Sequence, residues 1–152
     1  MTLDQIFSLT NGLATVGWAL LLFTPTWHVT RKVAFSLLIP ALLCLAYLLA
    51  MIAFPSESGI DFSSLESVVA MFAQREVVLV GWIHYLAFDL FVGLWISSNA
   101  RQHGIKHLYI VIPLVFTFML GPIGLLVYLV LRAILLKDLS TSNFQQDSAS
   151  TS

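Results

Sequence analysis

The chain has 152 residues, of which 59% are hydrophobic and only 10% are charged, and its formal net charge at pH 7 is -1. An ordinary soluble domain has about 45–50% apolar and about 25% charged residues, so this composition argues against a water-soluble fold. No run of Lys and Arg with interleaved aromatic residues is present in the sequence, which argues against nucleic acid as a partner. Lipid is therefore the expected surroundings of most of the chain.

The apolar residues fall into four long blocks, which we interpret as four transmembrane helices. These blocks cover about residues 5–23, 33–54, 77–97 and 107–136. No Lys or Arg precedes Arg31, so the first block is expected to be a retained span rather than a removable signal peptide. The predicted fold class is all-α, a multi-pass membrane protein with one domain over residues 1–137. A polar tail over 138–152 is expected to be disordered.

Two of the blocks contain residues that break helices. Pro40 lies inside the second block, where it cannot donate to the carbonyl of Ser36, and a kink is predicted there. The fourth block is longer than one span needs, and Gly121-Pro122-Ile123-Gly124 is its predicted break. Pro122 frees the carbonyl of Phe118, and the two glycines loosen the turn. Such a break at membrane depth must face protein or a water-filled cavity.

A short amphipathic helix is predicted in the long connector between the second and third blocks. Its apolar residues recur at helical spacing: Leu65, Val68, Val69 and Phe72. Ser63 and Glu66 have the spacing of a capping box. The helix could lie in the membrane interface or close over the bundle as a lid.

The positive-inside rule places the connectors with more Lys and Arg on the cytoplasmic side of the membrane. The connectors on one side of the predicted bundle have one more such residue than those on the other, so both termini are predicted to lie outside.

Ionisable side chains in the third block are the strongest functional signal. His84 and Asp89 are both expected to be buried near its middle, where an aspartate costs about 2.5–3.5 kcal/mol on insertion scales. At about 100° per residue these two side chains point roughly 140° apart, so no His–Asp pair is expected within one regular helix. Tyr85 and Trp82 instead share the face of Asp89 and offer it a hydroxyl and an aromatic wall.

Two interpretations of Asp89 stay open from the residues alone. It could form a catalytic or binding site with Tyr85 and Trp82, because ionisable groups inside a membrane are more often functional. Alternatively, it could hydrogen-bond to a neighbouring helix and fix the register of the bundle.

Other residues with reactive or charged side chains carry weaker signals. His103 and His107 could offer two imidazoles to a metal, but no third ligand is nearby and no metal site is predicted. Cys44 is the single cysteine, which excludes a disulfide framework and indicates a packing role. Arg101 and Lys106 are expected to meet lipid phosphates, with an alternative role in holding the polar end of a ligand.

Several short motifs stand together in the chain: Gly81-Trp82-Ile83-His84, Asp89-Leu90-Phe91, Gly121-Pro122-Ile123-Gly124, and Asn11 with Trp18 in the first block. With these motifs, over roughly residues 3–137, the chain resembles the membrane protein family of the plant abscisic-acid-deficient type. Plant members of that family are required for making neoxanthin from violaxanthin. The chain starts directly into its first span, without the chloroplast-targeting extension of plant relatives. It is thus similar to a bacterial member, and the bacterial inner membrane is its expected location.

The resemblance implies a non-redox rearrangement, in which a carotenoid epoxide opens to an allene. One group protonates the oxygen, another removes a proton from carbon, and no metal or other cofactor is required. A protonated Asp89 would be the acid, with His84 or Tyr85 as its proton partner. The substrate-binding residues expected with them are Trp82, Arg101, Gly121, Pro122 and Gly124.

Three functions compete at this point. The first is an enzyme that acts on, or is accessory to, the modification of a xanthophyll or related isoprenoid. The second is a non-catalytic membrane scaffold or lipid-binding subunit. The third, a proton-coupled carrier, is less favoured, because four helices without a clear inverted repeat make a thin transporter. The expected partners are membrane lipid and a carotenoid or isoprenoid ligand, and the oligomeric state, including a homo-oligomer, stays open.

Overall fold

The computed structural model describes residues 1–23, 37–55 and 61–136, and within them it contains six helices and no strand. This confirms the all-α class. The predicted tail over 138–152 lies outside the described residues, as do parts of two connectors.

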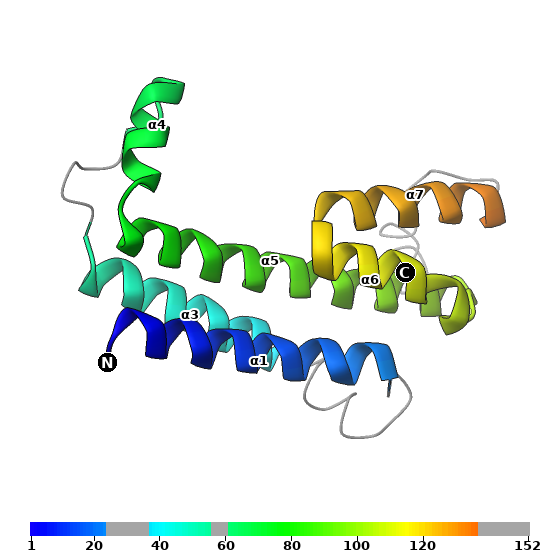
Figure 1. Ribbon diagram of the computed structural model, residues 1–152. Coiled ribbons are helices and arrows are strands. Elements are labelled where there is room, and N and C mark those ends of the chain that lie inside the picture. Colours follow the sequence, from blue (N-terminus) through cyan, green and yellow to red (C-terminus); the bar gives the residue numbers. More distant parts are fainter. Residues whose placement is uncertain (24–36, 56–60, 137–152) are drawn as a thin grey trace, which may run out of the picture.

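Two long helices form the axis of the bundle. α1 (Leu3–Phe23) and α5 (Arg75–Gln102) are the described helices that are long and apolar enough to cross a membrane. At 1.5 Å per residue they measure about 31 and about 42 Å, against about 30 Å of hydrocarbon. They lie side by side and run in the same direction (Figure 1). The third predicted span is therefore longer than expected and continues through most of the predicted basic connector.

The prediction of four spans is not confirmed, because the other apolar helices have only 14 to 16 residues. α3 (Leu38–Ala53) runs antiparallel to α1 and α5 and packs against both (Figure 1). Leu37 precedes it with a positive φ of 58°, so the second predicted span is not one continuous helix over 33–54. Pro40 lies in the first turn of α3, where a backbone N–H has no intrahelical acceptor, so the missing N–H of the proline costs no hydrogen bond. The kink predicted at this proline is therefore wrong for the described helix.

α4 (Leu65–Phe72) confirms the predicted amphipathic helix. Its N-cap is Ser64, whose hydroxyl accepts a hydrogen bond from the Ser67 N–H at 3.1 Å, so the predicted capping box at Ser63 is displaced by one residue. The helix stands at a steep angle to the bundle and does not close over it (Figure 1). Leu65 is 74% exposed, which fits seating in a membrane interface and does not fit a lid.

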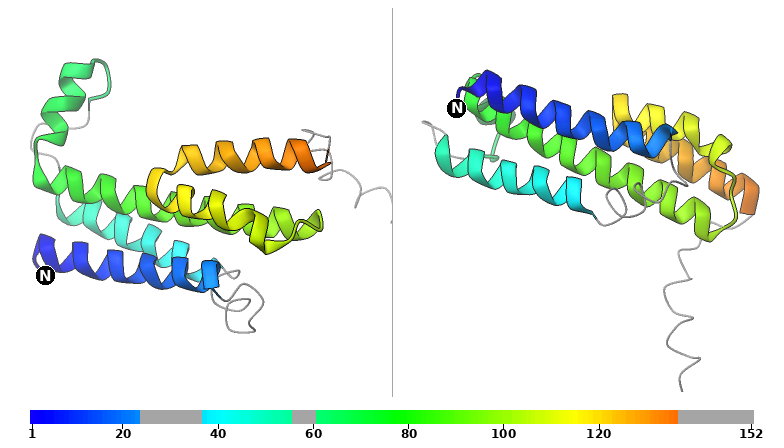
Figure 2. Two further views of the ribbon diagram at one scale, coloured as in Figure 1. Left: turned by 45° about the vertical axis from the view of Figure 1, so that its right-hand side comes forward. Right: turned by 90° about the horizontal axis from the view of Figure 1, so that it is seen from below.

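The predicted fourth span is a helical hairpin. α6 (His107–Leu120) runs back along α5, and α7 (Pro122–Leu136) reverses direction and lies beside α6 (Figure 2). Gly121 joins them with a φ of 49°. Gly124 lies so close to the backbone of Thr117 that a Cβ would not fit there. The break predicted at Gly121-Pro122 is confirmed, but it reverses the chain rather than bending it.

The hairpin changes the predicted topology. α1 and α5 run away from the N-terminal end of the bundle and α3 runs back toward it, whereas the hairpin returns to the end at which it starts (Figure 1). The N-terminus and the last residue of α7 therefore lie at opposite ends of the described bundle, and the C-terminus named in the topology prediction lies outside the described residues. At the hairpin end lie three of the described cationic residues: Arg101, Lys106 and Arg132. Arg75 lies at the N-terminal end.

Candidate functional site

One stripe of polar and aromatic side chains follows α5, and a second follows α1. On α5 the stripe consists of Arg75, Val78, Trp82, Tyr85 and Asp89, and on α1 of Asp4, Phe7, Asn11 and Trp18. The Arg75 guanidinium donates to Asp4 at 3.0 Å, and the Trp82 indole N–H donates to Asn11 at 3.2 Å. Both pairs join residues 71 positions apart, so the stripes run parallel and in register. The face predicted from Trp82, Tyr85 and Asp89 therefore lies along the seam between α1 and α5.

Asp89 lies at the inner end of this seam, and the residue is only 9% exposed. Its carboxyl group lies against the hairpin turn, since a Cβ built on Gly121 would be 2.8 Å from Oδ1. Within the described part of the chain, Oδ2 has no hydrogen-bond partner. Oδ1 of Asp89 thus lies against the turn, and Oδ2 remains available for a proton or a ligand.

Tyr85 connects Asp89 to the broken helix. Its hydroxyl lies beside the Asp89 carboxyl and donates to the carbonyl of Phe118 at 3.4 Å. That carbonyl is the one that Pro122 leaves without an intrahelical donor. The Phe118 ring lies 5.4 Å from the ring of Trp18, which closes the same region from α1. The hairpin break therefore faces protein.

His84 lies on another face of α5. Its ring stacks on Phe88 with 4.5 Å between the ring centroids and lies 5.8 Å from the ring of Tyr47 on α3. The side chain is exposed, so the prediction of a buried imidazole in this helix is wrong. His84 and Asp89 have separate neighbours, as the helical angle between them predicts.

The structure brings together only part of the predicted substrate-binding set. Gly121 touches Asp89, and the Trp82 ring lies 5.3 Å from that of Tyr85. Gly124 packs against α6 instead, and Pro122 is exposed at the turn. Arg101 lies near the end of α5, about 18 Å from Asp89 along the axis at 1.5 Å per residue.

A second polar cluster, which the sequence analysis missed, joins the end of α5 to α7. The buried Tyr128 hydroxyl donates to the Asn99 side chain at 2.6 Å. His103 Nδ1 donates to the backbone carbonyl of Asn99 at 2.8 Å, which leaves Nε2 to accept from the buried Arg132 at 3.3 Å. The sequence feature that could have indicated this cluster is the spacing of its residues. Asn99 and His103 are four positions apart on one helix, as are Tyr128 and Arg132 on the other, so each pair lies on one helix face.

His103 and His107, whose spacing could suit a metal ion, have separate hydrogen-bond partners in the protein. His107 Nε2 donates to the carbonyl of Leu22 at 3.1 Å and so ties the start of α6 to the last turn of α1. His103 belongs to the cluster with Asn99 and Arg132. Across the described residues, no group of three His, Cys, Asp or Glu side chains could hold a metal ion.

We expect Tyr128→Phe to weaken the attachment of the hairpin to α5. The variant keeps the ring and removes the hydroxyl that Asn99 accepts from. Interhelical hydrogen bonds in membrane proteins contribute about 0.6 kcal/mol on average and up to about 1.7 kcal/mol, so a loss near 1 kcal/mol is expected. SDS-induced unfolding of the purified protein measures it. Tyr109→Phe, on the exposed face of α6, is the matched control, and an equal loss there would contradict the assignment.

The fold and the site together define an all-helical chain with two membrane-length helices and a buried carboxyl group at the turn of a helical hairpin. A family model described as ABA DEFICIENT 4-like matches residues 5–128, which include every residue of the Asp89 site. The chain therefore belongs to the ABA4-like family. Comparisons with curated proteins and with solved structures gave no match.

Proposed function

We propose that this protein spans the membrane with three helices, α1, α3 and α5, and inserts the α6–α7 hairpin from one side to about three quarters of the hydrocarbon depth. The hairpin helices measure about 21 and about 23 Å at 1.5 Å per residue, and they start and finish at the same end of the bundle. The two membrane-length helices support this arrangement, as does the largely apolar exposed surface of the other helices. In lipid, irregular backbone is tolerated where protein covers it, and Tyr85 and Asp89 cover this turn.

Within this membrane domain, Asp89 is proposed to catalyse an acid–base isomerisation of a carotenoid or related isoprenoid. The observation that carries the proposal is Oδ2 of Asp89, a buried oxygen with no hydrogen-bond partner within the described residues. A buried polar atom without a partner is costly, and such atoms are often kept for a catalytic role. The resemblance to a carotenoid-modifying family supports the substrate class, and aromatic rings beside the carboxyl provide apolar contact for a polyene.

One carboxyl group is sufficient for the reaction, because the same oxygen can give a proton and later take one back. Protonated Asp89 gives its proton to the substrate oxygen while the carbon–oxygen bond of the epoxide breaks. The resulting carboxylate then takes a proton from the neighbouring carbon, and that C–H electron pair forms the new double bond. Asp89 ends protonated as it began, and the substrate is isomerised without any oxidant or reductant. Tyr85 lies one turn from the carboxyl and holds the Phe118 carbonyl beside it, and His84 takes no part, because its ring faces α3.

Asp89→Asn is expected to remove the product while leaving the protein in the membrane. The amide cannot deliver a proton, and general acid–base catalysis contributes about 10²–10⁴-fold to a rate. Wild type and variant are expressed in carotenoid-producing hosts that supply several xanthophylls, and their pigments are compared by chromatography. Glu66→Gln, an exposed acid of α4, is the matched control and should keep the wild-type profile.

The same experiment separates the catalytic role from a scaffold role. If well-inserted Asp89→Asn gives the wild-type pigment profile, Asp89 is not the acid. If the wild type itself forms no product and the variant changes only detergent stability or oligomer size, the buried carboxyl serves helix packing.

A further inference from the structure

A cleft of about 250 Å³ lies at the N-terminal end of the seam between α1 and α5, away from Asp89. Apolar side chains form its wall: Phe7, Val78, Leu79 and Trp82. Asp4 and Arg75 lie at its rim, where they are 82% and 75% exposed. An apolar wall with a few polar groups at one place is the usual composition of a small-molecule site.

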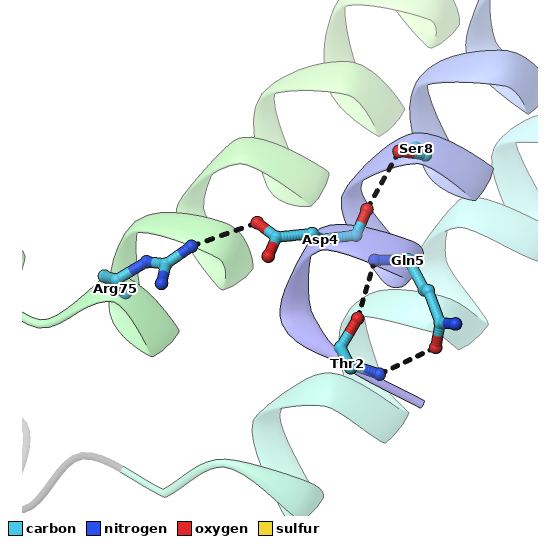
Figure 3. Close-up of polar contacts among 5 residues, drawn as sticks. All are labelled: Thr2, Asp4, Gln5, Ser8 and Arg75. Carbon is cyan, nitrogen blue, oxygen red and sulfur yellow. Dashed lines mark hydrogen bonds and ion pairs between the residues drawn. The ribbon is translucent and has the colours of Figure 1, made fainter.

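The rim carries no net charge. Arg75 donates to Asp4 at 3.0 Å, and the two side chains meet across the gap between α1 and α5 (Figure 3). The first turn of α1 is fixed around them, because Thr2 and Gln5 exchange hydrogen bonds of 2.9 and 3.3 Å. The pair offers both donors and acceptors to a ligand, but its charges cancel. This suits a neutral hydroxyl group better than a phosphate, a carboxylate or an amine.

Aromatic rings lead from this cleft toward Asp89. Phe7 lies 6.0 Å from Trp82, and Trp82 lies 5.3 Å from Tyr85. The hydrogen bond to Asn11 fixes the orientation of the indole. Exposure falls along the stripe, from 38% at Trp82 to 9% at Asp89. From the rim to Asp89 the stripe extends about 21 Å along the axis of α5, at 1.5 Å per residue. It is therefore long enough to contact an extended, narrow ligand.

We propose that the cleft binds the hydroxylated end of a linear isoprenoid, whose chain follows Trp82 and Tyr85 and whose reacting end meets Asp89. The identity of the reacting end rests on the proposed function, but binding in the cleft requires no reaction. The cleft thus gives the site a preference for a substrate with a neutral polar group at the end remote from the reaction.

The test uses all-trans-retinol, a polyene alcohol that accepts energy from tryptophan, with the full chain in nanodiscs of zwitterionic lipid. Val78→Phe fills the cleft from an exposed position and should weaken retinol binding at least about tenfold, which is about 1.4 kcal/mol. Val130→Phe, equally exposed on α7, is the matched control and should bind retinol as the wild type does. Unchanged binding by Val78→Phe would overturn the proposal.

A charge variant tests the polarity of the rim. Asp4→Asn leaves the Arg75 cation without its carboxylate, so the ratio of retinoic acid affinity to retinol affinity should rise at least about fivefold. An unchanged ratio would also overturn the proposal, since a purely structural role of the ion pair predicts no change of preference.

The outcomes for the cleft and for Asp89 are separable. Asp89→Asn should bind retinol normally while losing pigment conversion. Loss of conversion in Asp89→Asn with unchanged retinol binding in Val78→Phe would contradict the proposed cleft and support the catalytic role of Asp89. Weaker retinol binding in Val78→Phe with unchanged conversion in Asp89→Asn would support the cleft and contradict catalysis by Asp89.

Discussion

Gly124→Ala is expected to disrupt the α6–α7 hairpin. A Cβ at this position would overlap the backbone nitrogen and Cα of Thr117, and backbone atoms cannot move aside as the end of a flexible side chain can. Overpacking usually costs about 1–3 kcal/mol and occasionally more, and this contact should lie at the upper end of that range. SDS titration of the purified protein should show a much lower unfolding midpoint. Conversion of any substrate should fall with it, because the turn at Gly121 covers Asp89.

Gly12→Ala is the matched control for this change. Gly12 lies on α1, and a Cβ there meets no atom within 4 Å. Alanine favours a helix over glycine by about 1 kcal/mol, so this variant should be as stable as the wild type or slightly more stable. If both variants lost the same stability, the close approach of α6 and α7 would not be the cause.

Labelling from the two sides of the membrane is expected to find the ends of the bundle on opposite sides. The hairpin end carries Arg101, Lys106 and Arg132, whereas the other end carries Arg75 among the described residues. Basic residues near the ends of membrane helices are retained on the cytoplasmic side. The hairpin end should therefore face the cytoplasm, and the N-terminus should face outward.

Single cysteines introduced into a Cys44→Ser background measure this arrangement, since Cys44 is the free cysteine of the chain. In intact cells, a membrane-impermeant maleimide should label Ser63→Cys beside α4 and should leave Gln102→Cys at the end of α5 unlabelled. Permeabilised cells should label both. Labelling of both from outside would contradict the three-span arrangement, and labelling of Gln102→Cys alone would reverse its orientation.

Hydropathy and helix geometry were sufficient to predict the all-helical class, the first and third apolar helices and the face on which Asp89 lies. Both depend on local properties, namely a run of apolar residues and the angle of 100° between successive side chains. The same local rule placed the break at Gly121-Pro122, because a proline leaves a carbonyl without a donor wherever it lies in a helix. These features could be found without any knowledge of which helices touch.

The direction of the chain after Gly121 could not be found in this way. The length and hydropathy of 107–136 fit one tilted helix as well as two short ones. The outcome depends on contacts between residues, namely Gly124 with Thr117 and Tyr85 with the Phe118 carbonyl.

Two polar residues were misjudged for a related reason. Tyr128 was missed because the side chain that accepts its hydrogen bond belongs to α5. His84 was expected to be buried because it lies in the middle of a span, but its imidazole stacks on Phe88 and Tyr47 and stays exposed.

The hairpin does not cross from one end of the bundle to the other, and this has a consequence for how a hydrophobic molecule reaches Asp89. On one side of Asp89, α6 lies along α5 and covers it, while toward the N-terminus Phe7 and Trp82 remain exposed along the seam. In the proposed arrangement, a molecule dissolved in the outer leaflet can move sideways along this seam to Asp89 without leaving the hydrocarbon. A molecule in the inner leaflet meets the hairpin instead. The composition of a single leaflet would then determine the supply of substrate, whatever its concentration in water.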